Sequence, residues 1–480
     1  MLAGLFLAAL EATAVATAMP TAVADLGGMS RYSWAFSAYL LTSTTLLPLA
    51  GRLADLYGRR TIYVGSMGVF LVGSALCGLA QNFDQLILFR AIQGMGAAGV
   101  MPVSNTIIAD IYTLEERARV QGLFSAVWAL ASLIGPAVGG IVTDLFSWRY
   151  IFYFTIPFGL LSAIMLTSFL REPEVRRKHN LDIAGTALLT GAIALLLVAI
   201  LEGSVVWGWS SPWTITLMIA SVIMAAAFIR HESMVDEPIL PLDLFRNRII
   251  VVSSLGSIVI GTLLFTLTAY VPMFVQGVLG GTASQAGAPL IAMSIGWPIA
   301  STTAGHFMIR IGYRPLIIVG GTLSLAGGLL LVLASHGTSM PLLLAAMTIF
   351  GMGMGFAGTP YLVAVQNAVP WNRRGVTTSV SQFSRTIGGA IAVAAFGVLL
   401  NARLQAHLNQ TVDANVVLSP EVRSTMQPET LAAIAEALGT GLTAVFVACV
   451  ALACVGFVVN FYFPSGAAQS HVHRETPVEV

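Results

Sequence analysis

Charged residues are scarce in this chain. Asp, Glu, Lys and Arg together make up 9% of its 480 residues, whereas a soluble domain carries roughly 25%. Hydrophobic residues make up 56%, which is more apolar sequence than a water-soluble fold can bury. The shortage of charge therefore excludes a soluble globular protein and predicts an all-α integral membrane protein.

Cysteine is also nearly absent. The three cysteines, Cys77, Cys449 and Cys454, lie in apolar stretches without the paired or clustered spacing that disulfide frameworks and metal sites require. We expect them to be small core residues, and we expect no bound metal. The net charge of +1 is too small to attract a nucleic acid, so no nucleic-acid partner is expected.

The motifs of soluble enzymes are missing as well. No zinc, serine-nucleophile or P-loop constellation is present, so we expect no enzyme and no cofactor. The string Gly94-Met-Gly96-Ala-Ala-Gly99 has the spacing of a dinucleotide fingerprint, but it lies inside an apolar segment and follows no strand. Helix packing is the expected role of these glycines.

Fourteen apolar segments are long enough to cross a bilayer, since a spanning helix needs about 20 mainly apolar residues. The first has no basic leader and continues past Glu11 into Thr21, so we expect a span and not a cleaved signal peptide. The segments lie near 2–22, 33–51, 61–80, 86–108, 119–142, 150–170, 183–202, 212–230, 250–272, 286–307, 315–335, 341–364, 377–400 and 440–463.

The distribution of basic residues orients these spans. Seventeen of the 23 Lys and Arg residues lie in one set of loops and the tail, and four lie in the opposite set. Cytoplasmic loops carry the excess of basic residues, and an even number of spans returns the chain to its starting side. We therefore expect cytoplasmic N- and C-termini in the plasma membrane, which for a bacterium is the inner membrane.

An internal repeat relates two parts of the chain. Gly51 to Arg60 matches Gly305 to Arg314 at an offset of 254, and Gly94-Met95-Gly96 matches Gly351-Met352-Gly353 at an offset of 257. Near-constant offsets in the same order predict a duplicated unit. Two parallel halves that flank a site near the midplane are a transporter architecture.

The repeat predicts a 6+2+6 arrangement. Residues 1–170 form an N-terminal six-helix bundle, 171–249 two inserted transmembrane helices with cytoplasmic linkers, 250–465 a C-terminal six-helix bundle, and 466–480 a cytoplasmic tail. The longest outer loop, 401–439, contains an amphipathic stretch from Pro428 to Leu438 that predicts a short surface helix.

Several motifs resemble one family. Gly51-Arg-Leu-Ala-Asp55-Leu-Tyr-Gly58-Arg59-Arg60 resembles the loop 2–3 signature of the major facilitator superfamily, and Leu88-Phe89-Arg90-Ala-Ile-Gln93-Gly94-Met95-Gly96 resembles its span 4 signature. Gly135-Pro136-Ala-Val-Gly139-Gly140 is similar to the antiporter signature of its exporters. Leu10-Glu11-Ala-Thr13 is similar to the span 1 signature of drug–proton antiporters, and Trp148-Arg149-Tyr-Ile-Phe152 is typical of the fourteen-span branch.

The resemblance implies the major facilitator fold and the fourteen-span drug–proton antiporter family of the multidrug efflux type. The sequence departs from the family pattern in two places. Glu11 replaces the usual Asp of span 1, and no Asp or Glu occurs between Asp243 and Asp413. Some relatives that export divalent cations have an acid in the second half, so that capability is not expected here.

Glu11 and Arg90 are the candidate proton-coupling residues. Glu11 lies about ten residues into span 1, near the midplane at 1.5 Å per residue. Burial favours the neutral carboxyl and a nearby cation favours the charged one, so a carboxyl under both influences can exchange protons. Arg90 in span 4 is the expected partner, because an isolated buried Arg is costly. A purely structural ion pair is the alternative.

The resemblance implies a charge cluster at the cytoplasmic ends of spans 2 and 4 that holds the two halves together in the outward-facing state. We call this cluster the inner latch; solvated loop charges are the alternative. Its candidate residues are Gly51, Asp55, Gly58, Arg59, Arg60 and Asp110.

The antiporter motif, Gly135, Pro136, Gly139 and Gly140, predicts close packing and bending of span 5, because Pro removes a backbone hydrogen bond and Gly lets another helix approach. The resemblance adds a seal against proton leak.

The substrate site is expected between the halves, lined by aromatic and amide residues that suit lipophilic cations. Packing or lipid contact is the alternative for each of them, and Arg385 could serve the cavity or bind backbone carbonyls. The candidates are Trp34, Tyr39, Asn105, Trp128, Phe265, Tyr270, Trp297, Tyr361, Gln382 and Arg385.

These features predict a proton-coupled secondary exporter of lipophilic compounds, with lipophilic cations as the favoured class, working by alternating access. The expected partners are a small-molecule substrate, protons and the lipid bilayer, and a monomer is expected. Export of an endogenous metabolite, siderophore or antibiotic is the alternative that the same motifs serve. A membrane sensor is the remote alternative from another class.

Overall fold

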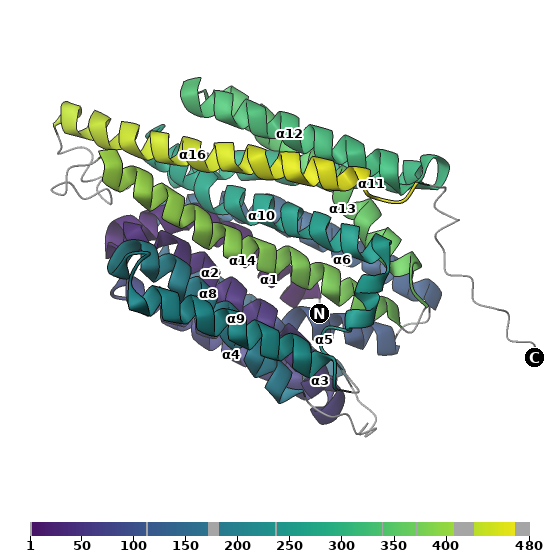
Figure 1. Cartoon of the computed structure of the whole chain (residues 1–480). Helices are drawn as coiled ribbons and strands as arrows, with labels where there is room; N and C mark the ends of the chain where they lie inside the picture. Colours follow the sequence, from purple (N-terminus) through teal and green to yellow (C-terminus); the bar gives the residue numbers. More distant parts are fainter. Residues whose placement is uncertain are drawn as a thin grey trace, which may run out of the picture. The chain divides into compact units, whose positions relative to one another are not determined.

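The computed structural model describes residues 2–111, 114–170, 182–235, 238–337, 339–370, 373–407 and 427–465. Within these ranges the regular structure is helical, and no strand occurs (Figure 1). Ten of the described helices are long and apolar enough to cross a membrane. The chain is therefore a multi-pass helical membrane protein.

Each of the fourteen predicted segments contains a helix, although the second is divided by a break at Leu46. The fourteen-span count and the cytoplasmic termini stay predictions. The helices of the first half are α1 (Leu2–Leu26), η1 (Met29–Arg31), α2 (Tyr32–Thr45), α3 (Leu47–Tyr57), α4 (Arg59–Leu79), α5 (Phe83–Ile111), α6 (Leu114–Leu145) and α7 (Arg149–Phe169). The helices predicted to be inserted are α8 (Ile183–Glu202), the π-helical turn η2 (Gly203–Trp207) and α9 (Pro212–Glu232). The helices that follow are η3 (Leu242–Arg246), α10 (Arg248–Gly277), α11 (Ala283–Ile311), α12 (Tyr313–Gly337), α13 (Met340–Asn367), α14 (Arg374–His407) and α16 (Pro428–Phe461).

The prediction of a separate surface helix from Pro428 to Leu438 is wrong. These residues form the first turns of α16, which continues without a break to Phe461. Ile434 and Leu438 are fully buried, so tertiary packing holds this stretch in the long helix. α14 extends to His407, so helices occupy both ends of the expected outer loop, and residues 408–426 lie outside the described residues.

The chain forms two compact units. The first contains Met1–Ile239, Thr268–Ile291 and Val393–Gly441, and the second contains Leu240–Leu267, Ala292–Ala392 and Leu442–Val480. The first unit thus combines the first half, the inserted helices and one end of each of α10, α11, α14 and α16. The predicted boundaries at 170, 249 and 465 follow the repeat and stay predictions.

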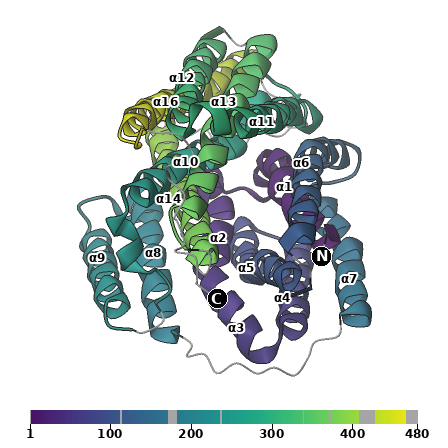
Figure 2. The same cartoon turned by 90° about the vertical axis from the view of Figure 1, so that its right-hand side faces the viewer.

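The inserted helices pack on each other and on the first half. α8 and α9 lie side by side (Figure 2), and α8 also contacts α2. Glu202 at the end of α8 accepts a hydrogen bond from Trp34 Nε1 at 3.0 Å and pairs with Arg31 at 3.4 Å. Arg31 also binds Asp84 at 2.6 Å. An acid of the inserted pair is therefore fastened to the start of α2.

The two halves repeat the same local geometry. In the first unit, a Cβ on Gly94 would lie 2.5 Å from Tyr39 O of α2, and one on Gly96 would lie 2.2 Å from Phe70 N of α4. In the second unit, a Cβ on Gly351 would lie 2.1 Å from Met293 O of α11, and one on Gly353 would lie 2.6 Å from Ser324 N of α12. Paired glycines thus let α5 and α13 each approach two neighbouring helices closely.

The connecting turns also match. Gly58 between α3 and α4 has φ +92°, and Gly312 between α11 and α12 has φ +84°. Side chains rarely tolerate such φ values, so glycine is required at this position of each repeat. The recurrence of glycine at the offset of 254 is therefore explained by the backbone conformation of the turn.

Gly312 and Gly305 provide a matched test of this explanation, because only Gly312 has a positive φ. Gly312→Ala should lower the free energy of unfolding by about 1–3 kcal/mol, because its backbone conformation is strained for a residue with a Cβ. Gly305→Ala lies within α11 and its Cβ meets no atom within 4 Å, so it should be neutral or stabilising by about 0.5–1 kcal/mol. Denaturant unfolding of the detergent-purified protein measures both, and equal effects of the two substitutions would contradict the assignment.

Candidate functional site

Glu11 of α1 is completely buried and binds Arg90 of α5. Arg90 Nη1 donates to Glu11 Oε1. The expected partnership is thus present, and it joins two helices within the first unit. The second carboxylate oxygen, Oε2, is buried and accepts no hydrogen bond from a described residue, although the Tyr39 hydroxyl lies near the carboxylate.

Arg90 is held by partners besides Glu11. Its Nε donates to Ala35 O of α2 at 3.1 Å, and its Nη1 also donates to Gln93 Oε1 at 2.7 Å. The guanidinium carbon lies 4.2 Å from the centre of the Tyr39 ring, which is a cation–π distance. Carbonyl, amide and aromatic ring together compensate a cation that is only 2% exposed.

A chain of polar side chains continues beyond Arg90. Gln93 Nε2 donates to Ser74 Oγ of α4 at 3.2 Å. Ser74 Oγ lies 2.8 Å from Thr155 Oγ1 of α7 and donates to Phe152 O at 2.9 Å. The sequence motif contained Gln93 but assigned it no role, and Ser74 and Thr155 were missed, because isolated hydroxyls in apolar spans give no spacing signal.

This arrangement can support one chemical step. The ion pair is enclosed by α1, α2 and α5, and Glu11 retains a buried carboxylate oxygen as a possible proton acceptor. When Glu11 becomes neutral, Arg90 still has Ala35, Gln93 and the Tyr39 ring. These neutral partners would still solvate the Arg90 cation after Glu11 binds a proton, which lowers the cost of breaking a buried pair.

The inner latch can be described only in part. Gly51 lies in α3, Gly58 forms the turn before α4, Arg59 is half-buried and Arg60 is exposed. The side chains of Asp55 and Asp110 lie outside the described residues. The latch therefore stays a prediction.

The antiporter motif lies where α6 meets two other helices. A Cβ on Gly135 would lie 2.0 Å from Thr13 Oγ1, and one on Gly139 would lie 2.4 Å from Ala14 O, both on α1. A Cβ on Gly140 would lie 2.5 Å from Ser284 Cα in the first turn of α11. The motif thus lets α6 approach α1 and α11 closely, and its role as a proton seal stays a prediction.

A second set of contacts in the first unit joins α1, η1 and α2 to the ends of α10 and α14. Tyr32 Oη donates to Ala269 O at 2.6 Å, Ser33 Oγ lies 2.8 Å from Tyr270 Oη, and Gln276 Nε2 donates to Thr17 O at 2.8 Å. The Asn401 amide donates to Ser30 O at 2.6 Å. We call these the closure contacts. Sequence reasoning missed them, because their partners are more than 200 residues apart.

Among the predicted substrate residues with described side chains, three lie in the first unit, and each has a partner there. The Trp34 indole donates to Glu202, Tyr39 lies beside Arg90, and Tyr270 Oη donates to Val393 O at 2.7 Å. The side chains of Asn105 and Trp128 lie outside the described residues.

The other candidates, Phe265, Trp297, Tyr361, Gln382 and Arg385, lie in the second unit. The Phe265 ring fills the space beside Gly389, and Trp297 approaches Gly358. Arg385 Nε is buried and has no hydrogen-bond partner among the described residues. Arg385 therefore has a buried hydrogen-bond donor that no described residue uses.

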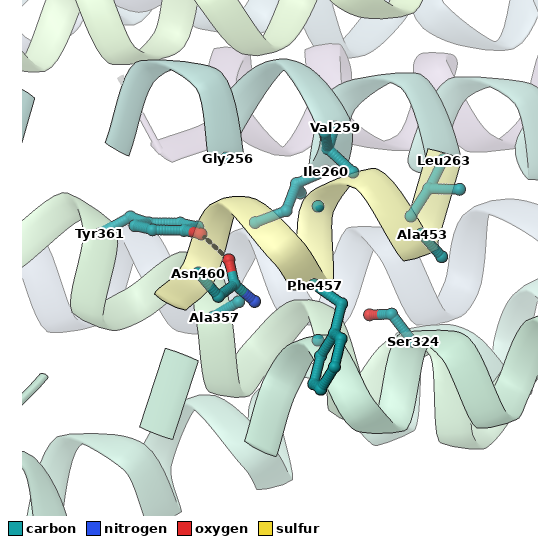
Figure 3. Close-up of a pocket in the computed structure, with 12 residues that line it drawn as sticks. Gly256, Val259, Ile260, Leu263, Ser324, Ala357, Tyr361, Ala453, Phe457 and Asn460 are labelled. Carbon is teal, nitrogen blue, oxygen red and sulfur yellow. Dashed lines mark hydrogen bonds between the residues drawn. The ribbon is translucent and has the colours of Figure 1, made fainter. Parts of the chain in front are cut away.

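Tyr361 borders a small cavity among α10, α12, α13 and α16 (Figure 3). Its hydroxyl donates to Asn460 Oδ1, and Ser324 and Phe457 also line the cavity. The volume of about 20 Å³ is room for about one water molecule. A drug-sized ligand needs roughly 300–1,000 Å³, so this cavity is not a substrate site in this conformation.

Comparisons with known proteins agree with this architecture. Multidrug transporter protein MdtP of Bacillus subtilis (strain 168) is 38% identical over 403 residues, which cover 84% of this chain and 74% of that protein. Multidrug resistance protein 3 of the same organism is 35% identical over 399 residues, which cover 83% and 78%.

The fold matches solved transporters. A bacterial homologue of the human lysosomal transporter Spinster, in an inward-facing and occupied conformation, has a TM-score of 0.68 at 16% identity and covers 99% of this chain and 97% of its own. The family model described as Major Facilitator Superfamily matches residues 1–393. This chain therefore belongs to the Major Facilitator Superfamily and is a membrane transporter, not an enzyme.

Proposed function

We propose that this transporter is a proton-driven exporter of lipophilic compounds, with lipophilic cations as the favoured class, in the plasma membrane, which for a bacterium is the inner membrane. The observation that carries the proposal is the fully buried Glu11–Arg90 pair with its remaining carboxylate oxygen. The multidrug names of two relatives at 38% and 35% identity support efflux as the direction and drugs as the cargo.

In the proposed cycle, a proton from outside neutralises Glu11 while the site is open outward. The bond from Arg90 to Glu11 weakens, and Ala35, Gln93 and Tyr39 keep Arg90 in place. The drug leaves outward, the protein turns inward, and the proton departs to the cytoplasm. A membrane potential that is negative inside adds about 2.3 kcal/mol per 100 mV for each net positive charge that the exchange carries into the cell.

The conformational parts of the cycle follow from the motifs. The inner latch would hold the cytoplasmic side closed while the outer side is open. The glycines of the antiporter motif would let α6 pack against α1 without a gap through which protons leak. Each half would then present one side of an alternating-access pathway.

Glu11→Gln tests the proton coupling. The amide keeps the shape of the side chain but cannot accept and release a proton at neutral pH. We expect drug uptake driven by a pH gradient into inverted vesicles to fall to the level measured without a gradient, while drug binding to the purified protein persists.

Asp84→Asn is the matched control, because it removes the same charge from an exposed surface ion pair. It should leave gradient-driven uptake unchanged. Normal uptake by the Glu11→Gln variant would exclude Glu11 as the coupling residue.

A cargo with an anionic group is the second candidate, which is the chemistry of some siderophores and other metabolites. Arg385 favours it. The described part of the second unit contains no acid later in the chain than Asp243, and Asp243 pairs with Arg373. Arg385 Nε lacks a hydrogen-bond partner in the same residues, so an anionic group on the cargo would supply one.

Arg385→Met and Arg385→Lys distinguish the two cargo classes. If the cargo is anionic, Arg385→Met should weaken its apparent affinity about tenfold or more, since a hydrogen bond to a charged group contributes about 1.5–3 kcal/mol. Arg385→Lys should retain part of the affinity. Uptake assays over cationic, neutral and anionic compounds measure this, and equal profiles for wild type and Arg385→Met would exclude a cargo contact.

A further inference from the structure

The first turn of α11 is capped by its own residues only in part. Thr282 N donates to Gln285 Oε1 at 3.1 Å, and Gln285 N donates to Thr282 Oγ1 at 3.2 Å. This is a reciprocal capping box. It leaves the backbone N–H groups of Ala283 and Ser284, which face outward from the end of the helix and have no partner in their own turn.

Asp144 of α6 binds both of these groups. Ala283 N donates to Asp144 Oδ1 at 3.0 Å, and Ser284 N donates to Asp144 Oδ2 at 2.9 Å. The Ser284 hydroxyl also donates to Oδ2. Among the described residues no Lys, Arg or His forms an ion pair with Asp144. Its charge is therefore directed at the positive end of the α11 dipole.

The approach of α6 to α11 depends on one face of α6. Pro136, Gly140 and Asp144 are four residues apart and lie on the same side of the helix. A Cβ on Gly287 would lie 2.6 Å from Pro136 O, and a Cβ on Gly140 would lie 2.5 Å from Ser284 Cα. The small residues bring the backbones together, and Asp144 then completes the contact at the helix terminus.

This contact connects the two repeats on one side of the membrane. α6 belongs to the first repeat and α11 to the second, and the predicted topology puts the end of α6 and the start of α11 at the outer face. The closure contacts from Tyr32, Ser33 and Gln276 connect the same two repeats. In the proposed alternating-access cycle the repeats separate on this side, so the contact from Asp144 would break when the outer side opens.

We propose that Asp144 is an outer latch, a positioning residue that stabilises the outward-closed state by capping α11. The proposal rests on the alternating-access cycle of the proposed function. It assigns the outer face a charge–dipole contact as the counterpart of the predicted inner latch. When the outer side opens, Asp144 is hydrated and the two N–H groups of α11 bind water. The contact therefore contributes free energy only to the outward-closed state and raises its population relative to the outward-open state.

Asp144→Asn tests the latch. The amide removes the charge and one acceptor oxygen, so the outward-open fraction should rise about 2- to 30-fold, which corresponds to the range measured for charges at helix N-termini. The probe is a cysteine at Ser33, which is buried at the closure contacts, in a background with Cys77, Cys449 and Cys454 replaced by Ala. A membrane-impermeant maleimide added outside should label it faster in proportion to the open fraction.

Hydrogen–deuterium exchange provides a second readout that needs no label. The amides of Ala283 and Ser284 should exchange faster in the Asp144→Asn variant, while those later in α11 should not. Asp144→Glu, which retains the charge, should restore most of the protection and so separates a latch from a loss of folding.

Asp25→Asn is the matched control, because Asp25 is an exposed acid whose partners Trp148 and Arg149 lie at the start of the neighbouring helix α7. It should leave both readouts at the wild-type level. The latch is excluded if Asp144→Asn changes neither labelling nor exchange, or changes them only as much as Asp25→Asn. Neither readout needs a cargo or a proton gradient. The outer latch and the proposed export are therefore tested independently, and either one can be excluded without the other.

Discussion

The central constraint in this molecule is a charge pair that is almost completely buried. Glu11 and Arg90 are expensive in a bilayer interior unless each compensates the other. That requirement brings α1 against α5, and the other bonds of Arg90 and Gln93 then add α2 and α4 to the same cluster. The packing of the first half therefore depends on the group that we assign to proton exchange. Glu11 and Arg90 have both a structural role and a proposed coupling role.

The second half lacks this constraint. The position equivalent to Arg90 is Met347, which is fully buried, while the paired glycines that position α5 and α13 are present in both halves. The two halves thus have the same helix contacts but differ in charge. A transporter built this way can concentrate proton chemistry in one half and leave the other to contact an apolar cargo, with Arg385 as a buried cation in that half.

Much of this architecture was predictable, because membrane burial makes single residues informative. Apolar length predicted where helices occur, the glycine repeats predicted the duplicated unit, and the cost of a lone buried charge predicted the pairing of Glu11 with Arg90. The start of α16 was missed, since the buried side chains of Ile434 and Leu438 extend the helix and only tertiary packing reveals them. Ser74, Thr155, Asp144 and Glu202 were missed because their partners are distant in sequence and their residue types are common.

The anchor of the inserted helices has a consequence for the history of the fold. Glu202 accepts the indole hydrogen of Trp34 and shares Arg31 with Asp84. Simple excision of α8 and α9 would leave the Trp34 indole N–H without its acceptor, and a buried donor without an acceptor is costly. A descendant of this chain without α8 and α9 would need a compensating change at position 34. The α8–α9 pair is thus tied to the first half through Glu202, and α2 depends on that pair for the hydrogen bond of Trp34.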